Sequence, residues 1–177
     1  MLAFVTSKAQ FDQLREIVYS QTDDGFEIRE LETPGYLRAT FRLLNMLGPV
    51  QRLYILKHYF SLFEKLDCLV VPEMTSSRLK THLGLRNTSL ILLSHGAGDR
   101  AIGFGEEIRH FDYVLLSGEK VRNRMLESGL IKPDNHAIVG YPKFDIFNIV
   151  KKEIKKYFDN DNPTILYNPH FDPRLSS

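Results

Sequence analysis

Short apolar runs alternate with stretches of helical periodicity along most of this chain. The apolar runs are bounded by Gly, Pro, Asn or Asp and are mostly rich in leucine or β-branched residues, which is typical of strands. A continuous run such as Leu90–Leu93 favours a strand covered on both faces, as in a parallel sheet. The expected strands are Leu2–Thr6, Phe26–Leu31, Cys68–Val71, Leu90–Ser94, Tyr113–Ser117, His136–Val139 and Thr164–Tyr167.

Helices are expected between these strands. Apolar residues recur at helical spacing over 11–18, 121–126 and 144–158. The longest helical region, 35–66, is interrupted at Gly48-Pro49, and a proline in the first turn is a signal for a new helix. Alternating strands and helices predict an α/β fold, namely a Rossmann-like, mostly parallel sheet with helices on both faces.

Composition places the chain among ordinary globular proteins. Its 177 residues are 43% hydrophobic and 25% charged, which excludes a largely disordered chain. The 23 Lys and Arg nearly balance the 22 Asp and Glu, so nucleic-acid binding is not expected. The single cysteine, Cys68, excludes an internal disulfide framework, and neither a membrane span nor a signal-like segment is present. We therefore expect a cytoplasmic protein.

The helical region 36–66 has a lopsided charge. Its basic residues outnumber its acidic ones, and two interpretations remain open. A basic amphipathic helix can lie on an anionic membrane surface. Alternatively, its leucine and phenylalanine side chains cover the sheet while the basic residues are solvated. The basic residues are Arg38, Arg42, Arg52, Lys57 and Lys65.

The richest candidate for chemistry is the glycine-rich segment directly after Leu90–Leu93. Ligands of open α/β sheets bind beyond the carboxyl ends of strands, and glycines allow close backbone approach to a phosphate. Within this segment, His95, Asp99 and Arg100 are concentrated beside Gly96 and Gly98. An imidazole with a pKa of about 6.5 can take a proton from a hydroxyl at neutral pH. A flexible glycine turn holding one histidine is the alternative.

The same segment formally fits the dinucleotide fingerprint G-x-G-x-x-[GA], but we do not expect a cofactor. Only residues 105–111 separate it from the next strand, whereas a crossover takes about 10–12 residues. The histidines lack metal-ligand spacing, so we expect no metal site. The sequence also lacks a nucleophile elbow and a P-loop.

Two further polar segments follow expected strands. Ser117, Glu119 and Lys120 come before a helix that Ser117 could cap, and the first N–H groups of a helix suit an anion. The run from Gly140 to Asp145 contains Pro142 and Lys143. A plain turn is the alternative for each.

The order and spacing of these three motifs resemble the CDP-glycerol glycerophosphotransferase family of teichoic-acid-type polymerases. The resemblance extends from Ser94 to about Asn168. It implies a two-domain GT-B architecture. Residues 1–160 would form its amino-terminal, acceptor-side domain, and 161–177 would be a linker and the first strand of a donor-binding domain. Alone, the chain would then be inactive.

The resemblance also implies roles for individual residues. His95 matches the family's His-Gly histidine and would act as a base toward the acceptor hydroxyl or stabilise phosphate. Asp99 is the second catalytic candidate because it lies in the same glycine-rich turn, not because the family supplies it. Lys143 replaces the family's arginine and lacks its bidentate fork. The expected phosphate- and substrate-binding residues are Gly96, Gly98, Arg100, Ser117, Glu119, Lys120, Gly140, Pro142, Lys143 and Asp145.

The expected activity is therefore transfer of glycerol phosphate, or a related group, from a CDP-linked donor to a polyol or glycan acceptor. This reaction serves cell-surface polymer synthesis, and peripheral contact with the inner face of the cell membrane through 36–66 would suit it. Two alternatives remain: a UDP-sugar glycosyltransferase or sugar 2-epimerase of the same fold, and a non-catalytic Rossmann-like binding module.

Overall fold

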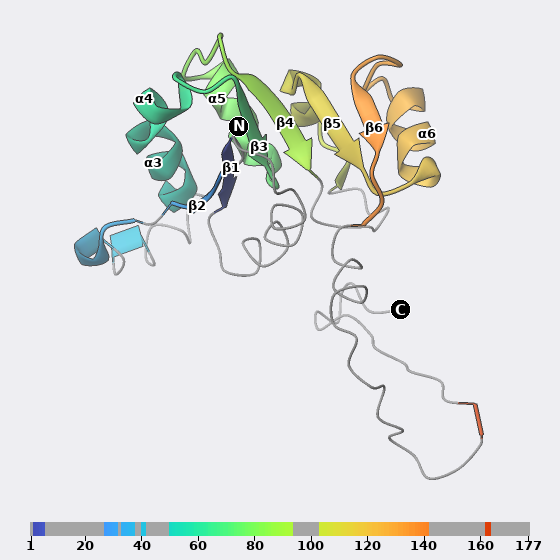
Figure 1. Cartoon of the computed structure of the whole chain (residues 1–177), viewed down its shortest axis with the longest axis horizontal. Helices are drawn as coiled ribbons and strands as arrows, with labels where there is room; N and C mark the ends of the chain where they lie inside the picture. The colour runs from blue at the N-terminus through green and yellow to red at the C-terminus, as the bar shows by residue number, and fades with distance from the viewer. Residues whose placement is uncertain are drawn as a thin grey trace.

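In the part of the chain that the structure describes, six parallel strands form one sheet in the order β2-β1-β3-β4-β5-β6 (Figure 1). The computed structural model describes residues 2–5, 27–31, 33–37, 40–41, 50–93, 103–141 and 162–163. The expected Rossmann-like α/β fold is confirmed, and six of the seven expected strands lie within one residue of their predicted ends. The seventh, Thr164–Tyr167, lies outside the described residues. The strands are β1 (Leu2–Val5), β2 (Glu27–Glu30), β3 (Cys68–Val71), β4 (Ser89–Leu93), β5 (Tyr113–Leu116) and β6 (His136–Ile138).

Helices and 3-10 turns connect these strands. A helix covers 50–58, after the Gly48-Pro49 interruption at which a new helix was predicted, and another covers the predicted 121–126. Pro49 itself lies outside the described residues. The helices expected over 11–18 and 144–158 lie outside the described residues. The described elements are η1 (Gly35–Leu37), α3 (Val50–His58), α4 (Phe60–Phe63), η3 (Met74–Ser77), α5 (Arg78–Thr81), η5 (Glu106–His110) and α6 (Glu119–Glu127).

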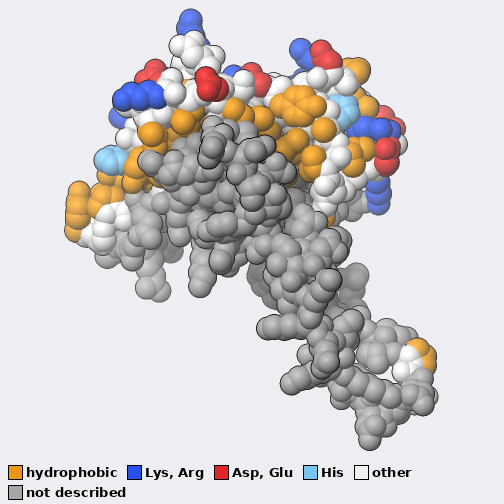
Figure 2. Space-filling view, viewed as in Figure 1, with side chains coloured by type: hydrophobic (Ala, Val, Ile, Leu, Met, Phe, Trp, Pro, Cys, Tyr) orange, Lys and Arg blue, Asp and Glu red, His pale blue; other side chains and the backbone are white. Residues whose placement is uncertain are grey.

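The core lies between the central strands and the helices. Consecutive residues of β3 and β4, such as Val70 with Val71 and Leu92 with Leu93, are buried, as expected for strands covered on both faces. Burial decreases toward β6, where Ile138 is 40% exposed. In Figure 2 hydrophobic side chains form a band beneath a rim of charged side chains at the top of the view.

The helices over 50–63 use their apolar residues to cover the core. Ile55, Leu56 and Phe63 are at most 2% exposed and belong to the core cluster. Arg52 is engaged in an ion pair with Glu73 rather than extended into solvent. The described helices over 50–63 therefore pack their apolar side chains on the protein, whereas Tyr36, earlier in the same region, is 81% exposed. None of the described helices is long and apolar enough to cross a membrane.

Asp112 fixes the amino end of the sheet. Its Oδ2 accepts a hydrogen bond from the Leu90 backbone N–H at 2.7 Å, and its own N–H donates to the Leu90 carbonyl at 2.9 Å. Lys80 of α5 forms an ion pair with the same carboxylate. Nearby, burial raises the pKa of the half-buried Cys68 thiol, and the charge of Asp112 adds to that increase. These contacts hold the ends of β4 and β5 in register.

Candidate functional site

The predicted polar segments leave the sheet at one edge. Strands β4, β5 and β6 are neighbours and parallel, so their carboxyl ends at Leu93, Leu116 and Ile138 lie on the same side (Figure 1). In open α/β sheets this is the edge where ligands bind. The following predicted site residues lie outside the described residues, and their roles remain predictions: His95, Gly96, Gly98, Asp99, Arg100, Pro142, Lys143 and Asp145.

The prediction that Ser117 caps the next helix is wrong. Helix α6 begins at Glu119, which places Gly118 at the capping position, and this residue makes no side-chain cap hydrogen bond. If Ser117 capped this helix, the helix would begin at Gly118. It begins one residue later, so the Ser117 hydroxyl does not cap it. The start of α6 thus has no side-chain cap, and its first N–H groups face this edge of the sheet.

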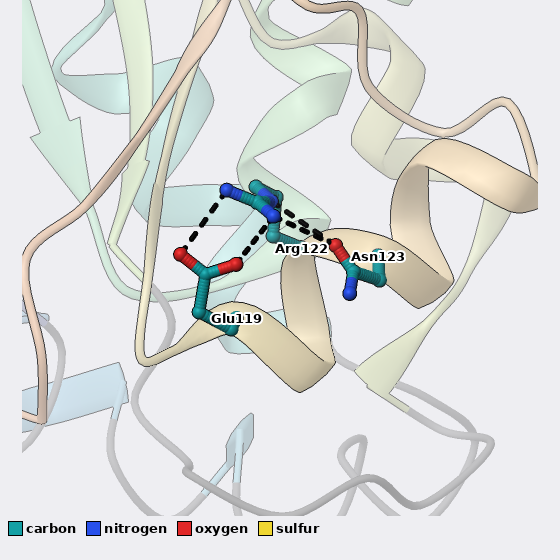
Figure 3. Close-up of polar contacts among 3 residues, drawn as sticks. All are labelled: Glu119, Arg122 and Asn123. Atoms are coloured by element: carbon teal, nitrogen blue, oxygen red, sulfur yellow. Dashed lines mark hydrogen bonds and ion pairs between the residues drawn. The ribbon is translucent and has the colours of Figure 1, made fainter.

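Glu119 forms a compact polar group with its helix neighbours (Figure 3). Arg122 donates from Nη1 to Glu119 Oε1 at 3.1 Å, and its Nη2 is ion-paired with Glu119 Oε2. The same guanidinium donates from Nε and Nη2 to Asn123 Oδ1, at 3.1 and 3.0 Å. Arg122 neutralises a carboxylate that alone would repel a phosphate. The sequence analysis did not identify Arg122. Its spacing of three residues from Glu119 on a predicted helix was the signal that could have indicated this ion pair.

Gly140 occupies the turn that was predicted for it. It directly follows Val139 at the end of β6, and its φ of 82° lies in the left-handed region that favours glycine. A Cβ at this position would meet no atom within 4 Å, so backbone conformation rather than crowding requires glycine here. Gly140 thus has the left-handed backbone conformation of a turn, at the position where a turn was predicted after the strand.

A fourth polar segment at this edge was missed by the sequence analysis. Glu73 and Thr75 follow β3, the strand next to β4. Arg52 of α3 donates from Nη1 to Glu73 Oε2 at 3.0 Å and to Thr75 Oγ1 at 3.2 Å. The signal was present, because polar residues directly follow the apolar run Cys68–Val71, but this segment has neither the glycines nor the histidine of the others.

The connection from β4 to β5 returns beside this fourth segment. Within the described residues 103–112 it contains the 3-10 helix η5. Elements η5 and η3 pack together, and a Cβ on Gly105 would lie 3.7 Å from Met74 Sδ. The Phe104 ring lies 3.9 Å from the guanidinium carbon of Arg124, and this cation–π contact ties the connection to α6.

The segment containing His95 therefore has fixed ends. It leaves the sheet at Leu93, beside β3, and re-enters the described chain at Gly103, next to Phe104. Among the described residues, no group of three or more His, Cys, Asp or Glu side chains could hold a metal ion.

Comparison with known proteins adds no further assignment. No family model matches the chain, and no curated protein matches it significantly.

Proposed function

We propose that this chain is the acceptor-side domain of a transferase that moves glycerol phosphate, or a related group, from a CDP-linked donor to a hydroxyl acceptor. One observation carries the proposal. The four neighbouring strands β3 to β6 are parallel, and each has a polar or glycine-containing segment at its carboxyl end. Such an edge favours ligand binding, and the motif order of the CDP-glycerol family supplies the ligand class.

In the proposed reaction His95 removes the proton of the acceptor hydroxyl. The hydroxyl oxygen attacks the phosphorus that carries the glycerol, a new P–O bond forms, and the bond to the CMP leaving group breaks. The proton remains on the imidazole until solvent takes it, so atoms and charges balance. Arg100 would offset the negative charge that builds on the phosphoryl oxygens, and such fixed charges are often the largest contribution to catalysis.

The donor nucleotide would bind in a second domain of the polypeptide, as in the family. The enzyme would work in the cytoplasm, with peripheral contact to the inner face of the membrane through 36–66. The pairing of Arg52 with Glu73 and its exposure of only 26% leave it less available to lipid headgroups than a solvated arginine. Basic residues elsewhere in 36–66 would have to supply the attraction.

A donor panel tests the proposal. The complete natural polypeptide is incubated with a glycerol phosphate polymer and with CDP-glycerol, UDP-glucose or UDP-N-acetylglucosamine, and nucleotide release is followed by chromatography. We expect CMP from CDP-glycerol only. Release of UDP instead would support the nucleotide-sugar enzyme of the same fold. No release from any donor would support the binding module and contradict the proposal.

A further inference from the structure

Residues 33–41, which we call the η1 segment, are attached to α3 at both ends. At the start of the segment, Oγ1 of the buried Thr33 accepts a hydrogen bond from Gln51 Nε2 at 3.1 Å. At its end, the ring centroid of the buried Phe41 lies 5.1 Å from that of Tyr54. Gln51 and Tyr54 are three positions apart on α3, so both attachments use the same face of that helix.

Tyr36 lies between these two attachments. It is 81% exposed, which makes it the most exposed large hydrophobic side chain of the described residues. It belongs to the turn η1, which is closed by a hydrogen bond from the Leu37 N–H to the Pro34 carbonyl at 2.9 Å. Figure 1 shows this turn at the left end of the molecule, and Figure 2 shows hydrophobic side chains at the surface there. A single exposed ring is common on globular proteins, so its surroundings must decide what it does.

The sequence around Tyr36 carries charge of one sign. Between Glu32 and Glu64 the chain has no Asp or Glu, although the whole chain has 22 of them against 23 Lys and Arg. The basic residues of this interval are Arg38, Arg42, Arg52 and Lys57. A basic stretch of this kind attracts an anionic surface.

Helix α3 continues this surface by one turn. The His58 ring stacks on the Tyr54 ring with 5.3 Å between centroids, and Lys57 and His58 follow Tyr54 by three and four positions. Lys57 and His58 are both exposed, and Lys57 has no ion-pair partner among the described residues. Lys57 therefore lies on the side of α3 to which the η1 segment is attached.

The apolar side chains of α3 cannot serve as a membrane anchor. A helix that lies on a bilayer buries its apolar face among the headgroups and acyl chains. In α3, however, Ile55 and Leu56 are at most 2% exposed and belong to the core. Within the described part of 36–66, the large hydrophobic side chain that remains exposed is Tyr36.

We propose that the η1 segment and Lys57 dock on an anionic lipid bilayer, with the ring of Tyr36 at the level of the headgroups. Tyrosine suits this position because its ring is apolar and its hydroxyl is polar. A specific protein partner would need about 800 Å² of surface around an apolar centre, which one exposed ring does not provide, whereas a bilayer needs no matching shape. This inference deepens the membrane contact of the proposed function and rests on it only for the purpose of docking.

Cosedimentation of the complete chain with vesicles tests the proposal. We expect binding to vesicles of equal parts phosphatidylcholine and phosphatidylglycerol, little binding to phosphatidylcholine alone, and release at high salt. Lys57→Gln should weaken binding about fivefold, whereas the matched control Lys132→Gln, which removes the same charge from an exposed lysine before β6, should not. Tyr36→Ser should weaken binding at least about fivefold and leave the unfolding temperature unchanged, because the ring is exposed. Tyr36→Phe should retain binding.

A fluorescence measurement locates the contact directly. The chain contains no tryptophan, so Tyr36→Trp introduces a single indole. Its emission should shift to shorter wavelength when the anionic vesicles are added, and lipids brominated near the headgroup should quench it. Val139→Trp is the matched control, because Val139 is 50% exposed at the end of β6 and should show neither change.

Several results would overturn the proposal: no binding to the anionic vesicles, unchanged binding in Tyr36→Ser, or no emission shift in Tyr36→Trp while the chain sediments. A dimer that Tyr36→Ser dissociates would also overturn it, because the occupant would then be a second copy of the chain. Failure of the transferase function would look different. If vesicles bind through Tyr36 but no nucleotide is released from any donor, only the proposed transfer fails. If CMP is released but vesicles do not bind, only the docking site fails.

Discussion

The ion pair between Arg52 and Glu73 should couple α3 to the end of β3 by a measurable free energy. The Nη1 and Oε2 atoms are 3.0 Å apart, and the side chains are only 26% and 20% exposed. Two unit charges at this distance attract by about 5.5 kcal/mol at an effective dielectric constant of about 20, before desolvation is counted. Desolvation of both groups removes most of this energy, so we expect a coupling of about 1.5 kcal/mol.

A double-mutant cycle measures this coupling. Arg52→Gln, Glu73→Gln and the double variant are unfolded in urea and followed by circular dichroism, and the cycle cancels what each side chain contributes elsewhere. The matched control is Arg109 with Glu106, which are separated by 2.9 Å but are 49% and 76% exposed. That pair should couple by less than about 0.5 kcal/mol. Equal couplings, or a value below about 0.3 kcal/mol for the first pair, would refute the reasoning.

Three further predictions concern residues in the strands and connections next to the candidate site. Asp112→Ala removes the acceptor for the Leu90 N–H and should lower the free energy of unfolding by about 1–2 kcal/mol in urea titrations; an unchanged midpoint would contradict this. Phe104→Leu removes the cation–π contact with Arg124 and should cost about 0.5–1 kcal/mol, an effect that Arg124→Gln should largely abolish. Burial raises the pKa of Cys68, so the folded chain holds this proton more tightly than the unfolded chain. Its stability should therefore decrease relative to Cys68→Ala as the pH rises above the ordinary thiol pKa of about 8.5, and parallel pH curves would argue against it.

The local sequence pattern was sufficient to predict where the strands lie, but not where the following helix starts or which strands pair. The apolar run Cys68–Val71 ends at Pro72, so the strand boundaries could be predicted to the residue. A similar precision failed at Ser117, because the helix starts at Glu119 and a shift of one residue moves the cap to Gly118. The order of the strands in the sheet is also not visible in the local pattern, because it depends on pairing between distant segments.

The pairing of Arg52 shows the same limit on a larger scale. In the sequence it was one of several basic residues on an amphipathic helix, available to lipid or to water. Its partner Glu73 is 21 residues away and on another element, and only the packing of α3 on the sheet brings the two together. The strand order likewise depends on long-range pairing, such as that of β1 with β3.

The most direct test of the central claim is the rate of CMP release from CDP-glycerol by His95→Ala in the complete natural polypeptide. The control is His110→Ala, which removes an exposed histidine of η5. We predict that His95→Ala abolishes CMP release while its unfolding temperature stays nearly unchanged, and that His110→Ala retains the full rate. Retained turnover in His95→Ala would contradict the assignment of the base and of the site around it.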